Sequence, residues 1–186
     1  MGNVKITATP LEGLYEVCKT TLSDTRGSFS RLFCEQDFEP IRAGLHFTQI
    51  NLSETRQRGT VRGMHYQTPP NSEAKLIRCL RGRVFDVAVD VRAGSPTFMQ
   101  WHATELSEDN DLAVFIPEGF AHGFQALTDD VQLLYLHTAP WAPSCEAGLR
   151  HDDPRMAIAW PLPVSMISDK DRGYPLIDEG FEGVRA

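Results

Sequence analysis

Apolar residues along the chain recur mostly at every second position, in short runs that end at glycine, proline, asparagine or aspartate. This spacing is typical of β-strands, because successive side chains of a strand point to opposite faces of a sheet. The pattern predicts about ten strands and therefore an all-β sandwich or barrel. The predicted strands are residues 13–19, 28–33, 46–53, 60–66, 75–81, 84–91, 97–106, 112–116, 122–126 and 131–138.

The connection at Gly82-Arg83 is short, so the strands on either side of it are predicted to form a β-hairpin. Helical periodicity is weak. Only residues 35–41 and the tail after Ser168 have room for a short helix, which argues against a parallel α/β sheet.

Residues 140–186 are rich in proline, aspartate and glycine and contain few strand patterns. Large apolar side chains in this segment predict a packed cap rather than a loose tail. These anchors are Trp141, Trp160 and Met166. A chain of 186 residues is long enough for one core, so we expect a single domain over residues 1–186.

Charge and composition exclude several classes of protein. The 18 Lys and Arg residues against 25 Asp and Glu residues give a net charge of −7, which argues against a nucleic-acid-binding protein. No apolar run reaches the roughly 18 residues that span a bilayer, and the N-terminus lacks a signal pattern, so we expect a cytoplasmic protein without a membrane segment. The four cysteines form no C-x-x-C pair, which argues against a disulfide scaffold.

Four side chains and the polar stretch Ser168-Asp-Lys-Asp171 could carry chemistry, yet each has an ordinary structural explanation when taken alone. For the stretch, that explanation is a solvated surface. His65 fits a hydrogen-bonded core histidine, and Lys75 fits a solvated edge residue that discourages strand pairing. His122 lies between two glycines, which predicts a tight turn at the barrel mouth, and Tyr135 fits a core tyrosine. Strand alternation places Arg62 and His65 on opposite faces unless a bulge intervenes.

Several histidines in a small β-barrel raise the question of a metal ion. The usual cupin metal site needs an H-x-H pair, and none occurs in this sequence. Convergence of His65, His122 and Glu73 stays open from spacing alone. We predict no metal site and chemistry that rests on side chains.

The segments taken together resemble the dTDP-4-dehydrorhamnose 3,5-epimerases, in order and over roughly residues 10–176. The resemblance rests on Asp24-x-Arg26-Gly-x-Phe29, Gln49-x-Asn51-x-Ser53, Gly59-Thr-Val-Arg-Gly-Met-His-Tyr-Gln67, Lys75, Val84-Phe-Asp-Val-Ala-Val-Asp-Val-Arg92, Ser95-Pro-Thr97, Ile116-Pro-Glu-Gly-Phe-Ala-His-Gly-Phe124, Tyr135, Asp153-Pro154, Trp160-Pro161 and Ser168-x-Lys-Asp171. It implies a cupin-type double-stranded β-helix (jelly-roll) barrel with a short C-terminal cap. It also implies an isomerase that needs neither metal nor cofactor, acts on a dTDP-linked 4-keto-6-deoxysugar and is usually a homodimer.

The resemblance also implies a role for each matching residue. His65 would be the base, held by Asp171, Lys75 would stabilise the enolate oxygen at C4, and Tyr135 would return a proton on the opposite face. The substrate-binding positions would be Arg26, Phe29, Gln49, Asn51, Arg62, His122, Trp141, Glu146 and Lys170. Arg26 suits the diphosphate, if contributed by a neighbouring subunit, and Trp141 can stack on the pyrimidine.

The sequence departs from the family after the tyrosine, where Ala139-Pro140-Trp141-Ala142-Pro143 replaces the common pair of tyrosines. Three alternatives therefore stay open: an epimerase of C3 or C5 alone, a ketoisomerase, and a non-catalytic sugar-nucleotide-binding module. A 3,4-ketoisomerase is expected to lack the four catalytic positions, and a binding module is expected to lack at least one of them. All four are present here.

Overall fold

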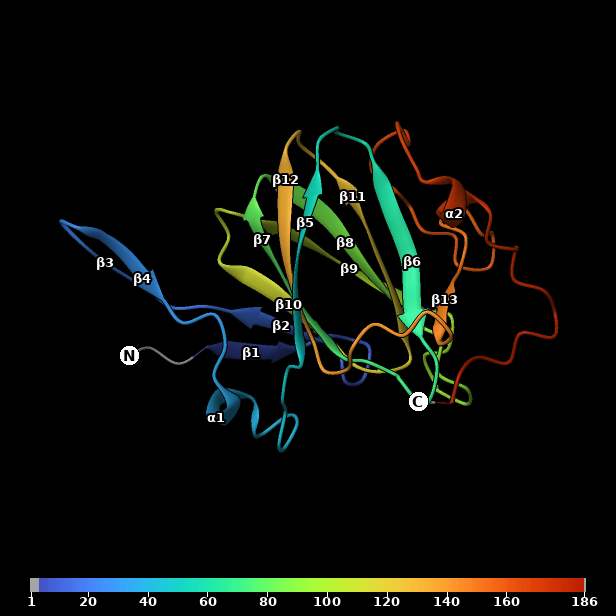
Figure 1. The fold of residues 1–186 in the computed structure, drawn as a ribbon, viewed down its shortest axis with the longest axis horizontal. Helices are drawn as coiled ribbons and strands as arrows, with labels where there is room; N and C mark the ends of the chain where they lie inside the picture. The colour runs from blue at the N-terminus through green and yellow to red at the C-terminus, as the bar shows by residue number, and fades with distance from the viewer. Residues whose placement is uncertain (1–3, 186) are drawn as a thin grey trace.

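The computed structural model describes residues 4–185 and is built almost entirely of antiparallel strands (Figure 1). The strands are β1 (Lys5–Ala8), β2 (Tyr15–Cys18), β3 (Thr21–Asp24), β4 (Gly27–Ser30), β5 (Gln49–Thr55), β6 (Val61–Gln67), β7 (Lys75–Arg81), β8 (Arg83–Asp90), β9 (Trp101–Ser107), β10 (Leu112–Ile116), β11 (Phe120–Ala126), β12 (Val131–His137) and β13 (Glu146–Gly148). Two short helices, α1 (Glu35–Phe38) and α2 (Asp169–Arg172), lie where the sequence left room for them.

Two large sheets face each other. One has the strand order β1-β2-β10-β7-β12-β5, and the other has the order β13-β6-β11-β8-β9. The main core fills the space between them and draws on both, with Ile77, Leu106, Phe124 and Leu133 among its buried members. This arrangement is the cupin-type jelly roll, so the predicted all-β fold class is confirmed.

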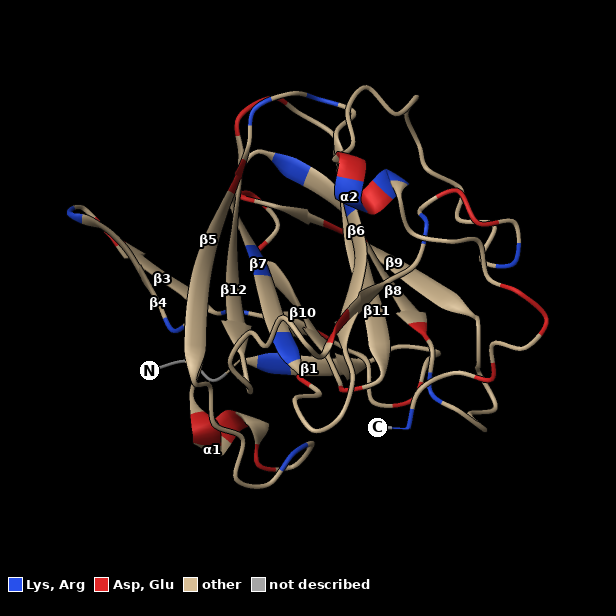
Figure 2. Cartoon of the chain, turned by 45° about the vertical axis from the view of Figure 1, so that its right-hand side comes forward, with Lys and Arg blue, Asp and Glu red and all other residues tan. Residues whose placement is uncertain are grey.

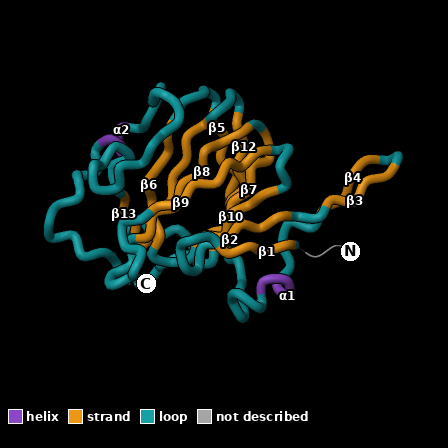
Figure 3. The backbone as a smooth tube through the Cα atoms, turned by 180° about the vertical axis from the view of Figure 1, so that it is seen from behind, coloured by secondary structure: helices purple, strands orange, loops and turns teal. Residues whose placement is uncertain are grey.

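Both sheets are also covered on part of their outer faces. A second apolar cluster packs Phe38 and Leu45 against Leu76 and Phe115 of the larger sheet. The C-terminal segment packs against the outer face of β8, and Figure 3 shows its loops beside β6 and β13. Of the three predicted anchors, Trp160 joins this cluster, whereas Trp141 and Met166 are 58% and 55% exposed, so their prediction as anchors is wrong. Double coverage explains why apolar residues of β8 are buried on both faces, as in Val87-Ala88-Val89.

The predicted hairpin at Gly82 is wrong. β7 pairs with β10 and β12 in one sheet, whereas β8 pairs with β9 and β11 in the other. The chain crosses between sheets at Gly82, whose φ of +76° and close approach to Thr128 both favour glycine. A short turn therefore serves as a corner of the jelly roll.

Charged residues gather in the loops, at strand ends and on both helices, and the middle of each sheet is largely free of them (Figure 2). Among residues 4–185, no helix is long and apolar enough to cross a membrane.

Candidate active site

Polar side chains replace apolar ones at one end of the inner core. Lys75, His122 and Tyr135 lie on β7, β11 and β12, each two residues along its strand from a member of the inner core. Because alternate residues share a face, these side chains point into the space between the sheets. The site therefore continues the core rather than lying on top of it.

His65 and Asp171 form a hydrogen-bonded pair. The distance between Nε2 of His65 and Oδ1 of Asp171 is 2.7 Å, and the other carboxylate oxygen accepts from the Gly63 N–H at 3.1 Å. Asp171 is 4% exposed, while the His65 side chain is 34% exposed. The histidine therefore faces open space and the aspartate lies behind it.

The short helix α2 positions this aspartate. Ser168 caps the helix, and its Oγ accepts a hydrogen bond from the Asp171 N–H at 3.0 Å. Burial acts to raise the pKa of Asp171, but the hydrogen bond and charge of His65 and the Gly63 N–H outweigh it and hold that pKa below its usual range. The aspartate is therefore ionised at neutral pH and accepts the Nε2 proton of His65, which leaves Nδ1 as the basic atom.

A bulge brings Arg62 and His65 to the same pocket. The register between β6 and β11 shifts where Gly63 and Gly123 meet, and a Cβ on Gly63 would lie 2.5 Å from the Gly123 Cα. This close approach requires glycine and interrupts the alternation of β6. The resulting pocket of about 380 Å³ is lined by Thr60, Val61, Arg62, His65, Met166, Ile167, Ser168, Lys170 and Asp171.

His122 lies inside the barrel, so the predicted position at a turn by the mouth is wrong. It sits within β11, is 5% exposed, and its Nε2 is 2.8 Å from Oδ2 of the buried Asp86 on β8. Burial lowers the pKa of His122, outweighing the opposite effect of Asp86. The tight turn forms earlier, at Gly119, and β11 starts before the histidine.

Lys75 is buried and central rather than a solvated edge residue. It is 6% exposed, and its strand β7 lies between β10 and β12. Its Nζ is 3.2 Å from Oε1 of Glu73 and donates to the His65 carbonyl oxygen at 3.3 Å. A buried ammonium group with a carboxylate partner gives the site a fixed cation.

Tyr135 lies between two histidine rings. The His122 ring meets it edge-on at 5.8 Å, and the His137 ring lies nearly parallel to it at 5.9 Å and 11°. Burial raises the pKa of Tyr135 well above its ordinary value, with a further contribution from the charge of Asp86. The phenol therefore keeps its proton at neutral pH and can donate it.

The other predicted binding residues on the barrel contact one another or neighbouring backbone. Gln49 Oε1 accepts from the Trp141 N–H at 3.0 Å, and Lys170 Nζ donates to Glu146 Oε1 at 2.5 Å. Arg62 donates to the Glu54 carbonyl oxygen at 2.9 Å. Asn51 contacts His137, and Trp141 is 58% exposed.

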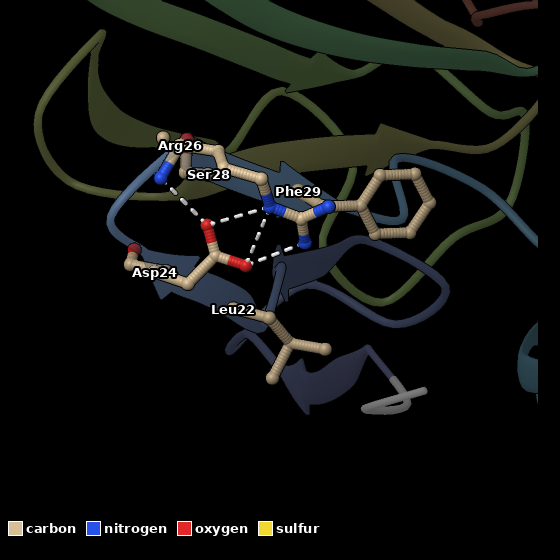
Figure 4. A pocket seen from close by; sticks show the side chains of 7 residues that line it. Leu22, Asp24, Arg26, Ser28 and Phe29 are labelled. Atoms are coloured by element: carbon tan, nitrogen blue, oxygen red, sulfur yellow. Dashed lines mark hydrogen bonds and ion pairs between the residues drawn. The ribbon is translucent and has the colours of Figure 1, made fainter.

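Arg26 and Phe29 are not brought to this site within one chain. Both lie on the hairpin of β3 and β4, which projects from the barrel on the side away from β6 and α2 (Figure 1). The Arg26 side chain is 88% exposed and pairs with Asp24, while Phe29 is 60% exposed. Figure 4 shows these residues with Leu22 around a hollow formed by the hairpin alone.

Three residues of the site were missed as partners in the sequence: Glu73, Asp86 and His137. Asp86 shares a face with Val84 and Ala88, so strand alternation alone places a carboxylate in the core, where it needs a partner. His137 shares a face with Tyr135 in the same way. His65, His122 and His137 each bind a different carboxylate, and within residues 4–185 no cluster of metal-ligating side chains is found.

The sequence of this chain is similar to those of known sugar-nucleotide epimerases. The dTDP-4-dehydrorhamnose 3,5-epimerase family model matches residues 8–179. A dTDP-4-dehydrorhamnose 3,5-epimerase of Sinorhizobium fredii is 45% identical over 84% of this chain and 80% of its own length. A dTDP-4-dehydrorhamnose 3-epimerase of Streptomyces niveus is 39% identical over 91% of this chain and 82% of its own length.

A solved structure has the same fold. The dTDP-6-deoxy-D-glucose-3,5-epimerase of Legionella pneumophila Philadelphia 1, in complex with dTDP-4-keto-L-rhamnose, superposes with a TM-score of 0.90. It is 37% identical and is covered, like this chain, over 99% of its length.

Proposed function

The chain belongs to the dTDP-4-dehydrorhamnose 3,5-epimerase family, and from this premise we propose how its residues carry out the reaction. The protein is an isomerase that epimerises C3 and C5 of dTDP-4-dehydro-6-deoxyglucose and so forms dTDP-4-dehydrorhamnose. The observation that carries the proposed mechanism is that His65, paired with Asp171 of α2, lies on one sheet, while Lys75 and Tyr135 lie on the other.

Both inverted carbons are adjacent to the C4 ketone, so each proton leaves as the bonding electrons move into an enolate. His65 takes this proton at Nδ1, because its Nε2–H is bound by Asp171. The ionised aspartate then stabilises the imidazolium that forms. The same pair serves at C3 and C5 in turn, after His65 has released its proton to solvent and Tyr135 has taken one up between the two inversions.

Lys75 stabilises the negative charge that develops on the C4 oxygen. Tyr135 then donates its proton to the carbon from the other side. The topology supports this assignment, since β6 with His65 and β12 with Tyr135 belong to facing sheets. A sugar ring between the sheets has the base on one face and the acid on the other, which produces inversion.

The remaining residues orient the nucleotide sugar. We assign Arg62 and His122 to the sugar and its diphosphate. Arg62 lines the pocket beside His65, and the His122 ring contacts Tyr135. Trp141 stacks on the pyrimidine, held through its backbone by Gln49. Asn51, Glu146 and Lys170 complete the contacts.

Proton NMR in deuterated water tests this function with dTDP-4-dehydro-6-deoxyglucose as substrate. Deuterium should appear at both C3 and C5. Deuterium at C3 alone would make the chain a 3-epimerase, as its Streptomyces niveus relative is named. Loss of exchange at both carbons would contradict the proposed reaction.

Tyr135→Phe should separate the two halves of the reaction. The variant keeps His65 and Lys75, so exchange at C3 and C5 continues, but inversion falls by about 100-fold or more because the acid is missing. The ratio of exchanged substrate to inverted product, followed by NMR, measures this. Unchanged product formation would place the acid elsewhere.

A homodimer would place Arg26 and Phe29 of one chain at the active site of the other. We propose that the β3–β4 hairpin reaches a second copy of the chain and places Arg26 near the substrate diphosphate. Support comes from its projection beyond the barrel and from the exposure of Leu22 and Phe29, which suit burial against a partner.

Subunit complementation tests the shared site. Arg26→Ala and His65→Ala variants should each have low activity. A mixed dimer combines His65 of one chain with Arg26 of the other, so a random mixture should recover about a quarter of the wild-type rate. The two variants are unfolded, mixed in equal amounts and refolded together. The activity of this mixture is then compared with that of each variant refolded alone. No recovery in a mixture that sedimentation shows to be dimeric would contradict the proposal.

A further inference from the structure

Glu73 binds two groups of the site at once, although the mechanism above gives it no role. Its side chain is 9% exposed and lies just before β7. Oε1 is 3.2 Å from Lys75 Nζ, and Oε2 is 2.8 Å from His137 Nδ1. One buried carboxylate therefore links the cation of the site to a histidine on the neighbouring strand β12.

His137 also contacts Asn51, through the other nitrogen of its ring. A carboxylate only accepts hydrogen bonds, so Nδ1 of His137 must carry the hydrogen. In the neutral ring Nε2 is then an acceptor, and it lies 3.3 Å from Nδ2 of Asn51. The Asn51 amide is thereby oriented with its Nδ2 toward the histidine, which leaves its Oδ1 available to a substrate.

The same histidine supports Tyr135. Its ring lies nearly parallel to the tyrosine ring, with centroids 5.9 Å apart, and its side chain is 11% exposed. Two hydrogen bonds fix the plane of the imidazole. Tyr135 also keeps its edge-on contact with the His122 ring, so the position of the phenol does not depend on His137 alone.

The Glu73 carboxylate is charged. Burial acts to raise its pKa, but the hydrogen bond from His137 and the charge of Lys75 outweigh burial and hold the pKa of Glu73 below its usual range. This charged carboxylate forms an ion pair with the buried ammonium group of Lys75 and holds it in place.

We propose that Glu73 and His137 are a positioning pair, in which Glu73 fixes Lys75 directly and orients Asn51 through His137. The inference rests on the proposed function, since Lys75 and Asn51 take their roles from it. Neither member of the pair touches the reacting carbons. Removing Glu73 should therefore act mainly on the chemical step, and removing the His137–Asn51 contact should act mainly on substrate binding.

Two variants separate these effects. Glu73→Gln keeps the shape but removes the charge beside Lys75, and it should lower kcat by about 10- to 100-fold, as loss of a supporting partner does at other sites. His137→Asn keeps a donor toward Glu73 but cannot reach Asn51, and it should raise KM by about two- to tenfold with little change in kcat.

Glu16→Gln is the matched control. Glu16 lies on β2, accepts from Thr104 Oγ at 3.0 Å and is 3.6 Å from His102 Nε2, so it too is a carboxylate beside a histidine. Its neutral variant should keep wild-type kcat and KM. A purely structural role for Glu73 would make its variant behave like this control, with changes confined to the melting temperature.

A nitrogen-15 NMR spectrum of the histidine rings gives a readout that is independent of turnover. His137 should show a protonated Nδ1 in the wild type, and this pattern should change in Glu73→Gln.

Wild-type kcat in folded Glu73→Gln, together with unchanged KM in His137→Asn, would overturn the proposal. If Glu73→Gln does not fold, an unchanged KM in His137→Asn overturns it alone. If the wild type exchanges no substrate proton, the proposed function fails, and an unchanged ring pattern in Glu73→Gln then overturns the pair separately.

Discussion

Replacing His65 by alanine is expected to lower kcat by about 100- to 10,000-fold, the range over which a positioned acid or base accelerates proton transfer. The side chain is 34% exposed and borders the pocket, so its removal takes little packing from the core. Exchange of deuterium into C3 and C5 should fall in parallel with product formation, because both begin with the same proton removal.

Asp171→Asn should give a loss of similar size by a different route. Asparagine can donate a hydrogen bond to Nε2 of His65, which moves the ring hydrogen to Nδ1 and removes the basic lone pair from the substrate side. The fold should survive, since the amide oxygen can still accept from the Gly63 N–H.

Circular dichroism and thermal unfolding would establish that both variants are folded before their exchange rates are compared by NMR. The double variant should be about as slow as either single variant, because the two residues act as a unit. Additive losses in the double variant, or exchange at the wild-type rate in His65→Ala, would show that another group is the base.

Lys75→Met is expected to lower kcat by about 100- to 1,000-fold, as does the loss of one donor that stabilises a developing oxyanion elsewhere. Methionine fills a similar volume without the charge. The effect should appear in both exchange and inversion, in contrast to Tyr135→Phe, because the enolate itself is destabilised. Initial rates of deuterium exchange provide the measurement.

A second variant separates the missing cation from damage to the site. In Lys75→Met the buried Glu73 loses its ion pair, and an unpaired carboxylate can disturb the surrounding structure. Lys75→Met/Glu73→Gln removes this charge as well. Activity should stay low in the double variant if the cation acts on the C4 oxygen. Recovery toward the wild-type rate would instead assign the loss to the unpaired carboxylate.

Much of the strand structure followed from local sequence. The predicted strand 112–116 coincides with β10, and predicted 131–138 contains β12. Three short strands were missed, namely β1, β3 and β13, which have only three or four residues and too few alternations to form a pattern. Short strands depend on the partners that they pair with.

The pairing of strands could not be obtained in the same way. The residues around Gly82 predict a hairpin by every local rule, yet β7 and β8 belong to different sheets. What decides their placement is burial: Ile77 and Val84 both enter the core between the sheets, while Leu76 and Val87 pack on opposite outer faces. These contacts join segments that are distant in the sequence.

The sequence by itself determined which residue types stand on one face of each strand, because the two-residue repeat is a property of the extended backbone. The sequence thus placed Lys75, His122 and Tyr135 on strands, each on the same face as a core residue two positions away. Only the tertiary structure decided their partners. The Glu73–His137 and Asp86–His122 contacts join residues 64 and 36 positions apart, and no local rule specifies them. A buried charge must find its partner in space, so the fold as a whole determines the chemistry of the site.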